Sequence, residues 1–256
     1  MTESPTVRLA VLIDADNVSS SHSSALLAEL ARYGVPTVKR AYGDWTTQQL
    51  TGWKGELARH AIQPIQQFAN TVGKNSTDSA LIIDAMDLLY SGNLDAFALV
   101  SSDSDFTRLA TRLRESGKTV YGLGLRKTPA SLVAACDRFI YLEVLGSESA
   151  PETAPGANDP TSEEAPLPNL QSLLTKAINS ASQDDGTVSV SGLGNYLRSV
   201  STSFDPRLYG HSKLSALVQA QPYLTVTGSG SGMQVSLKSR APAKKTAKKA
   251  AKKASA

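Results

Sequence analysis

The sequence predicts an α/β fold with a parallel sheet and helices on both of its faces, followed by a small helical domain that ends in a hairpin. Strand and helix patterns alternate through the first 146 of the 256 residues, as in proteins whose parallel strands are joined by helices. Two strand patterns are uninterrupted apolar runs, RLAVLI at 8–13 and AFALV at 96–100. Such runs are typical of strands that are buried on both faces.

The alternating segment begins with the apolar strand at 8–13, which runs directly into Asp14. The helix expected next has its apolar residues on one face and ends at Gly34; these apolar residues are Leu26, Leu27, Leu30 and Tyr33. The elements expected after it are a strand at 35–42, a helix at 47–61 and a short strand within 65–68.

The second half of this segment starts with a helix that Ser76 or Thr77 can cap. Its apolar positions are Ala80, Ile83, Met86 and Tyr90. After the strand at 96–100, Leu109 and Leu113 mark another helix, which ends at Gly117, and a strand is expected at 119–123. Thr128 and Pro129 suit the N-cap and first residue of a short helix, and a last strand is expected at 139–142.

Composition divides the chain into four parts, at 1–146, 147–166, 167–238 and 239–256. The second part is a linker rich in Pro, Glu, Ser, Thr and Ala without aromatic residues. The third begins with an amphipathic helix, and its later stretches VSVSGLGNYL and YLTVTGSGSGMQVSL indicate a paired segment leading into a helix and a terminal hairpin. With a further helix at 213–218, these elements describe a winged helix. The fourth part repeats Lys-Lys pairs and is expected to be a disordered tail.

The net charge of +3 is the sum of unlike regions. Residues 1–146 contain 14 basic and 15 acidic residues, and residues 147–165 contain five acidic residues and no basic one. Residues 166–237 contain four basic and three acidic residues, whereas residues 238–256 contain eight basic residues and no acidic one. The basic charge therefore belongs to the tail, which indicates an arm that binds nucleic acid rather than a basic folded surface.

Several classes of protein are disfavoured by composition. No apolar run reaches the roughly 18 residues of a transmembrane helix, and the chain begins without a basic and apolar leader. The single cysteine, Cys136, excludes a disulfide framework, and the isolated His22, His60 and His211 make a zinc site unexpected. A cytoplasmic, soluble protein without a membrane partner is expected. Cys136, Trp45 and Trp53 are interpreted as packing residues, although both tryptophans could stack on bases.

Carboxylates follow both of the buried strands. Asp14-Ala15-Asp16-Asn17 comes after one strand, and Ser101-Ser102-Asp103-Ser104-Asp105 comes after the other. Ligands of open parallel sheets bind at the carboxyl ends of strands, where the strand order reverses. If the two strands are neighbours, Asp14 and Asp103 face each other, and Asp78 approaches from the first turn of a helix. Carboxylates in one cleft repel unless a cation joins them, and oxygen ligands suit Mg²⁺ or Mn²⁺. Alternatively, Asp16 or Asp105 alone could simply cap a helix.

Four segments carry a more specific resemblance, namely LIDADN at 12–17, YGDW at 42–45, KNSTD at 74–78 and VSSDSDFTRLATRLRESGKTVYGLG at 100–124. They resemble the NYN family, PIN-like ribonuclease domains of the LabA type with a Rossmann-like parallel sheet. The resemblance implies catalytic and metal-binding roles for Asp14, Asp78, Asp103 and Asp105. It also implies accessory roles for Asp16, Asn17, Lys74 and Ser102. Relatives often have Gly where this chain has Ala15 or Ser102.

The third part of the chain resembles the OST-HTH/LOTUS family on LxxLL at 170–174, the segment 188–219 and the terminal hairpin. That family is a winged helix of RNA-associated proteins and is often joined to NYN domains. The resemblance implies RNA binding, with phosphate contacts at Arg198, Arg207, His211 and Lys213. The alternative is that these four are ordinary solvated residues. In the tail, the residues expected to contact nucleic acid are Lys244, Lys245, Lys248, Lys249, Lys252 and Lys253.

Together these features predict a metal-dependent ribonuclease with an RNA-binding winged helix and a basic arm. The expected partners are RNA, structured or not, and any nucleic acid that meets the tail without sequence preference. A homo-oligomer is compatible with the sequence. Two alternatives stay open: a non-catalytic RNA-binding or regulatory protein with a vestigial acidic pocket, and a DNA-associated architectural protein, since the tail resembles those of histone-like proteins.

Overall fold

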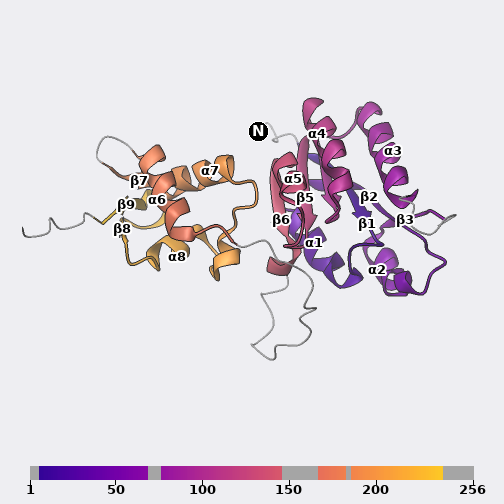
Figure 1. Cartoon of the computed structure of the whole chain (residues 1–256), viewed down its shortest axis with the longest axis horizontal. Coiled ribbons are helices and arrows are strands. Elements are labelled where there is room, and N and C mark those ends of the chain that lie inside the picture. Colours follow the sequence, from indigo (N-terminus) through magenta and orange to yellow (C-terminus); the bar gives the residue numbers. More distant parts are fainter. Residues whose placement is uncertain (1–5, 69–75, 146–166, 183–185, 239–256) are drawn as a thin grey trace, which may run out of the picture.

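The computed structural model describes residues 6–68, 76–145, 167–182 and 186–238. Within these ranges the chain forms an N-terminal α/β domain and a smaller C-terminal domain (Figure 1). The linker at 147–166 and the tail at 239–256 lie outside the described residues, as does Lys74. The domain boundaries inferred from composition therefore remain predictions.

The N-terminal domain contains a six-stranded parallel sheet in the order β3-β2-β1-β4-β5-β6. Its strands are β1 (Arg8–Asp14), β2 (Val35–Gly43), β3 (Gln63–Gln66), β4 (Ala96–Val100), β5 (Thr119–Gly124) and β6 (Arg138–Tyr141). The two apolar runs, β1 and β4, are hydrogen-bonded neighbours at the centre. The strand order reverses between them, so the predicted fold class and the predicted neighbourhood of the two strands are confirmed.

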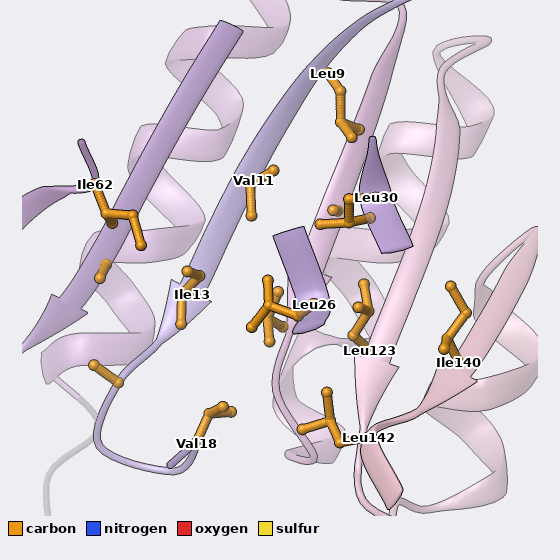
Figure 2. Close-up of a cluster of buried hydrophobic side chains, with 14 of the residues drawn as sticks. Leu9, Val11, Ile13, Val18, Leu26, Leu30, Ile62, Leu123, Ile140 and Leu142 are labelled. Atoms are coloured by element: carbon orange, nitrogen blue, oxygen red, sulfur yellow. The ribbon is translucent and has the colours of Figure 1, made fainter. Parts of the chain in front are cut away.

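Helices cover both faces of this sheet because alternate residues of each strand point to opposite sides. Leu9, Val11 and Ile13 pack on the face covered by α1 (Ser23–Leu30) and α2 (Trp53–His60) (Figure 2). Ala10 and Leu12 pack on the opposite face. The helices of that face are α3 (Ser76–Tyr90), α4 (Thr107–Glu115) and α5 (Ala130–Ala135). No helix in the described ranges is both long and apolar enough to cross a membrane.

The C-terminal domain has its own core, built from three helices and a three-stranded antiparallel sheet in the order β7-β9-β8. Its elements are α6 (Leu170–Ala181), β7 (Val188–Ser189), α7 (Val190–Val200), α8 (Leu214–Gln219), β8 (Leu224–Thr227) and β9 (Gln234–Leu237). The expected terminal hairpin is β8–β9. Short 3₁₀ turns complete both domains, namely η1 (Ser20–His22), η2 (Gln49–Gly52), η3 (Ser104–Phe106), η4 (Leu142–Val144), η5 (Pro206–Tyr209) and η6 (Gly230–Gly232).

The two domains touch at the β6 edge of the parallel sheet, where the loop after α7 approaches the N-terminal domain (Figure 1). The Phe139 amide of β6 donates to the Thr202 carbonyl at 2.9 Å, and the Thr202 hydroxyl donates to the Val133 carbonyl at 2.9 Å. Four charged side chains extend this contact. We call them the interdomain ion pairs, and they are Glu29, Arg138, Asp205 and Arg207.

Three local expectations needed correction. The helix expected at 47–61 divides into η2 and the shorter α2, which ends at Ala61 in the left-handed conformation (φ 49°). The strand expected within 65–68 is β3 at Gln63–Gln66; it is a half-exposed edge strand, so no alternation of apolar residues marks its bounds. Thr128 does not cap α5, because its hydroxyl donates to the Leu125 carbonyl and Pro129 takes the N-cap position.

The face of α3 also differs from the apolar positions singled out in the sequence. Ile83 and Tyr90 are 62% and 71% exposed, whereas Leu81, Ala85 and Leu89 are buried. The helix carries apolar residues on more than one face. Its sequence therefore predicts the helix but does not decide which side meets the sheet.

Candidate functional site

The candidate site lies at the carboxyl edge of the central strand pair. Ile13 of β1 is in register with Val100 of β4, so Asp14 and Ser101 follow these strands side by side. The Ser101 hydroxyl donates to Oδ2 of Asp14 at 2.8 Å and accepts a hydrogen bond from the Asp103 amide at 3.1 Å. Ser101 thus connects the carboxylates that follow the two strands.

Asp14 is fully buried, and the side-chain hydrogen bonds that hold its carboxylate all reach one of the two oxygens. Its Oδ2 accepts hydrogen bonds from the Asn17 side-chain amide and from Ser101, both at 2.8 Å. Its Oδ1 is buried without a hydrogen-bond partner in the part of the chain that the structure describes. Burial raises the pKa of Asp14 above its usual value, against the opposing effect of these two hydrogen bonds. A buried carboxylate oxygen without a partner is costly unless a ligand satisfies it.

Asp103 and Asp105 are positioned by the tight turn η3. The Asp105 amide donates to Oδ1 of Asp103 at 2.9 Å, and the buried Phe106 anchors the turn. Asp103 therefore has the capping role that is common for aspartates after strands. That role uses one of its two carboxylate oxygens. Capping and cation binding are compatible at this residue.

Asp78 completes the group from the first turn of α3. One carboxylate oxygen from each of Asp78, Asp103 and Asp105 lies within 4.8 Å of the other two. The pKa of Asp78 is raised to about 6, first by burial and then by the negative charges of Asp14, Asp103, Asp105 and Asp16. We call Asp14, Asp78, Asp103 and Asp105 the acidic cluster.

The acidic cluster fits a hard divalent cation. It offers carboxylate oxygens, which are the preferred ligands of Mg²⁺ and Mn²⁺. Burial and, after it, the neighbouring carboxylates raise the pKa of Asp78, and the Oδ1 atom of Asp14 has no partner among the described residues. A cation held by Asp78, Asp103 and Asp105 would favour the ionised form of Asp78. In the described ranges Asp78, Asp103 and Asp105 are the residues whose carboxylates come close enough together to share an ion.

The accessory residues have distinct places. Asn17 orients Asp14, and Asp16 accepts a hydrogen bond from the Thr77 hydroxyl at 2.9 Å. Ser102 accepts from the Leu125 amide at 2.8 Å and so holds the loop after β5. Sequence reasoning did not assign roles at the site to Ser101 or Thr77. The position of Ser101 directly after β4, opposite Asp14, was the available signal.

The residues expected to contact phosphate in the C-terminal domain are not equivalent. Lys213 is exposed and Arg198 hydrogen-bonds Asn195 at 2.7 Å on the same helix, while His211 is half-buried. Arg207 differs, because its guanidinium bonds both Glu29 oxygens at 3.0 and 3.1 Å and Asp205 at 2.7 Å. We therefore revise the expectation for Arg207, which is already held by two carboxylates.

The residues interpreted as packing residues do pack. The Trp53 indole is buried and donates to the Val18 carbonyl at 3.1 Å, and the half-buried Trp45 donates to the Ile65 carbonyl at 3.0 Å. Cys136 is fully buried, and burial raises the pKa of its thiol to about 12. A thiol with that pKa is no nucleophile at neutral pH.

The chain combines an α/β domain with a small winged-helix domain. In the α/β domain, acidic residues gather where the strand order of the parallel sheet reverses, as in PIN-like nuclease domains. The family comparisons agree with this arrangement. Residues 8–143 match the NYN domain and residues 165–236 match the OST-HTH/LOTUS domain. The chain belongs to the NYN family of PIN-like nuclease domains and also carries an OST-HTH/LOTUS domain.

One solved structure that is similar to part of this chain is a protein of unknown function from Vibrio parahaemolyticus. It is 18% identical, and the match covers 55% of this chain and 96% of that chain with a TM-score of 0.46. No curated protein matches the chain.

Proposed function

We propose that the chain is a metal-dependent ribonuclease whose acidic cluster holds Mg²⁺ or Mn²⁺. One observation carries the proposal: three carboxylates converge within 4.8 Å, next to the charge of a buried Asp14, in a domain of a nuclease family. When bound, such a cation lowers the pKa of a coordinated water and neutralises charge on a phosphate. The residues of the acidic cluster would hold the cation, and water would be the attacking group, so no side chain needs to act as a nucleophile.

The chain's own residues keep the carboxylates in place. Ser101 and Asn17 fix Oδ2 of Asp14, which leaves Oδ1 for the ligand. The turn η3 fixes Asp103, and the first turn of α3 fixes Asp78. The carboxylates therefore come from three places in the fold, namely the end of β1, the turn η3 that carries both Asp103 and Asp105, and α3. Support of ligand side chains by the surrounding fold is what an efficient metal site requires.

In the same proposal the C-terminal domain and the tail bind RNA. Arg198, His211 and Lys213 are the proposed phosphate contacts of the domain. The tail has no base-reading groups, so it adds affinity without sequence preference. Deletion of residues 241–256 is expected to weaken binding to all sequences alike. It should reduce the slope of the logarithm of the binding constant against the logarithm of the salt concentration by up to about four for single-stranded RNA, at about 0.7 per lysine contact. An unchanged slope would contradict a role for the tail.

The function is tested by incubating the full chain with end-labelled RNA and DNA in Mg²⁺, Mn²⁺ or a chelator. We expect cleavage of RNA that needs the cation and is lost in Asp103→Asn. Asp87→Asn is the matched control, because Asp87 is an exposed carboxylate on α3, outside the acidic cluster. RNA binding without cleavage in any metal would favour the non-catalytic alternative. A preference for binding DNA duplexes would favour the architectural one.

A further inference from the structure

A groove of about 340 Å³ adjoins the acidic cluster on the side of the loop after β5. It is lined by Asn17, Ser102, Asp103, Ser104, Lys127 and Pro129. Two of these residues belong to the site already described, since Asp103 is in the acidic cluster and Asn17 orients Asp14. Lys127 is the basic residue of the lining, and its side chain is exposed.

The backbone that presents Lys127 is tightly fixed. The Thr128 amide and hydroxyl both bond the Leu125 carbonyl, at 2.9 and 2.6 Å, and close a turn with Lys127 inside it. The Leu125 amide donates to Ser102, and the Arg126 amide donates to Glu143 at 2.8 Å. The buried Thr128 side chain anchors the far end of this turn.

Gly124 brings this turn close to the site. A Cβ at position 124 would lie 2.7 Å from the Ser101 carbonyl oxygen and 2.7 Å from Oγ1 of Thr128. No side chain fits there, so the turn can approach the strand end that carries Ser101 only because residue 124 is glycine. The position of Lys127 along the groove is therefore set by packed backbone.

The charge of Lys127 is not used by the protein itself in the described ranges. No ion pair joins Lys127 to a carboxylate there, although Asp103 lines the same groove. A polyanion that approaches the acidic cluster meets repulsion from its carboxylates, and a cation presented beside them offsets that repulsion locally. Lysine suits this role because its ammonium group binds phosphate oxygen as a compact point charge.

We infer that Lys127 forms a phosphate subsite, which holds a nucleic-acid backbone phosphate next to the one that is cleaved. The inference rests on the proposed function, which supplies an RNA substrate that is cleaved at the acidic cluster. In it Lys127 positions that substrate. Ser104 is exposed and lines the same groove, so its hydroxyl is a second donor available to a bound phosphate.

Substrates that carry one neutral methylphosphonate at successive positions provide the test. In the wild-type chain, replacement of the contacted phosphate is expected to raise KM about tenfold, with kcat changed less than about twofold. Lys127→Ala should raise KM for the unmodified RNA by a similar factor and should be insensitive to the same replacement, because the two changes remove one interaction. Lys127→Arg should restore most of the sensitivity. Lys118→Ala is the charge-matched control, since Lys118 precedes β5 at the opposite edge of the sheet.

Two outcomes separate this inference from the proposed function. If the wild type cleaves RNA and Lys127→Ala keeps its KM and its sensitivity to every replacement, the subsite is wrong and the ribonuclease stands. If no RNA is cleaved in any metal, the ribonuclease proposal fails, and equilibrium binding of the same RNA series decides on Lys127. A Kd that responds to the replacements equally in wild type and Lys127→Ala would then overturn the subsite.

Discussion

The acidic cluster and the interdomain ion pairs each contain a nearly fully buried carboxylate, Asp14 and Glu29, with exposed fractions of 0% and 5%. Their surroundings differ. Glu29 accepts two hydrogen bonds from Arg207, one from Arg32 and one from the Tyr33 hydroxyl. Asp14 accepts side-chain hydrogen bonds from two neutral groups, those of Asn17 and Ser101.

The two pKa shifts have opposite signs for this reason. Burial raises the pKa of Asp14, and the neutral donors do not compensate it. Burial acts on Glu29 in the same direction, but the hydrogen bonds and charges from Arg207, Tyr33 and Arg32 outweigh it and lower the pKa. A buried carboxylate is tolerated when a cation pairs with it. The interdomain ion pairs include their cations, whereas in the function we propose the acidic cluster takes its cation from solution.

The largest expected effect comes from Asp14→Asn. The amide keeps the shape and its oxygen can still accept from Ser101 and Asn17, but the charge that a cation needs is gone. Cleavage should fall at least about 100-fold, since even outer partners of metal sites are worth roughly 10–100-fold. The metal-free protein should lose no stability, because the buried charge is removed. Rates of RNA cleavage and urea unfolding midpoints in chelator measure both. Wild-type cleavage by this variant would remove Asp14 from the site.

Metal should stabilise the wild type but not a variant with a broken acidic cluster. At a concentration of 100 times Kd, binding to the folded state alone adds about 2.7 kcal/mol to the free energy of unfolding. We expect that gain from Mn²⁺ for the wild type and Asp87→Asn, and little of it for Asp103→Asn. Thermal unfolding with and without the ion measures it. An equal gain in all three proteins would place the ion elsewhere.

Glu29→Gln should have the opposite effect: the free energy of unfolding should fall, and the rate of RNA cleavage should be unchanged. Loss of one partner of a buried ion pair costs about 3–5 kcal/mol when the other charge is left alone. Arg207 keeps Asp205 at 2.7 Å, so about 2 kcal/mol is expected, along with a looser interdomain contact. Urea unfolding and the radius of gyration from small-angle scattering measure these effects. Arg59→Gln is the control, because Arg59 is an exposed residue that forms an ion pair within α2. A Glu29→Gln protein as stable and as compact as the wild type would show that the contact contributes little.

How far the sequence predicts this molecule depends on how local each determinant is. The strand at 8–13 is apolar on both faces, so its pattern marked β1 to within one residue, while the half-exposed β3 was placed two residues late. That Asp14 lies beside the loop that carries Asp103 was predictable, because the carboxyl ends of adjacent parallel strands share an edge. The role of Arg207 was not, since its partner Glu29 is 178 positions away in the other domain. Only the docking of the two domains creates that pair.

The smallest expected effect concerns Asp78 in the metal-free protein. Its pKa in the folded chain is about 6, above its ordinary value of 3.8, so the folded state holds this proton more tightly than the unfolded state does. Stability from this group is therefore present at low pH and is lost as the pH rises from about 4 through about 6. Asp78→Asn removes this pH-dependent loss of stability, because the amide does not ionise. Because Asp78 is partly exposed, solvent screening reduces the gain to about 1 kcal/mol at pH 7.5.

Urea unfolding in chelator at pH 4.5 and pH 7.5 checks this sign. Asp78→Asn should be more stable than the wild type at pH 7.5, and the difference should shrink at pH 4.5, while Asp87→Asn should show no such change. Addition of Mn²⁺ at pH 7.5 should reverse the order of the two proteins, because the cation binds the ionised carboxylate that the variant lacks. If Asp78→Asn is the less stable protein in chelator at pH 7.5, then hydrogen bonds of the Asp78 carboxylate outweigh the repulsion, and the acidic cluster resembles the interdomain ion pairs in being complete without a ligand.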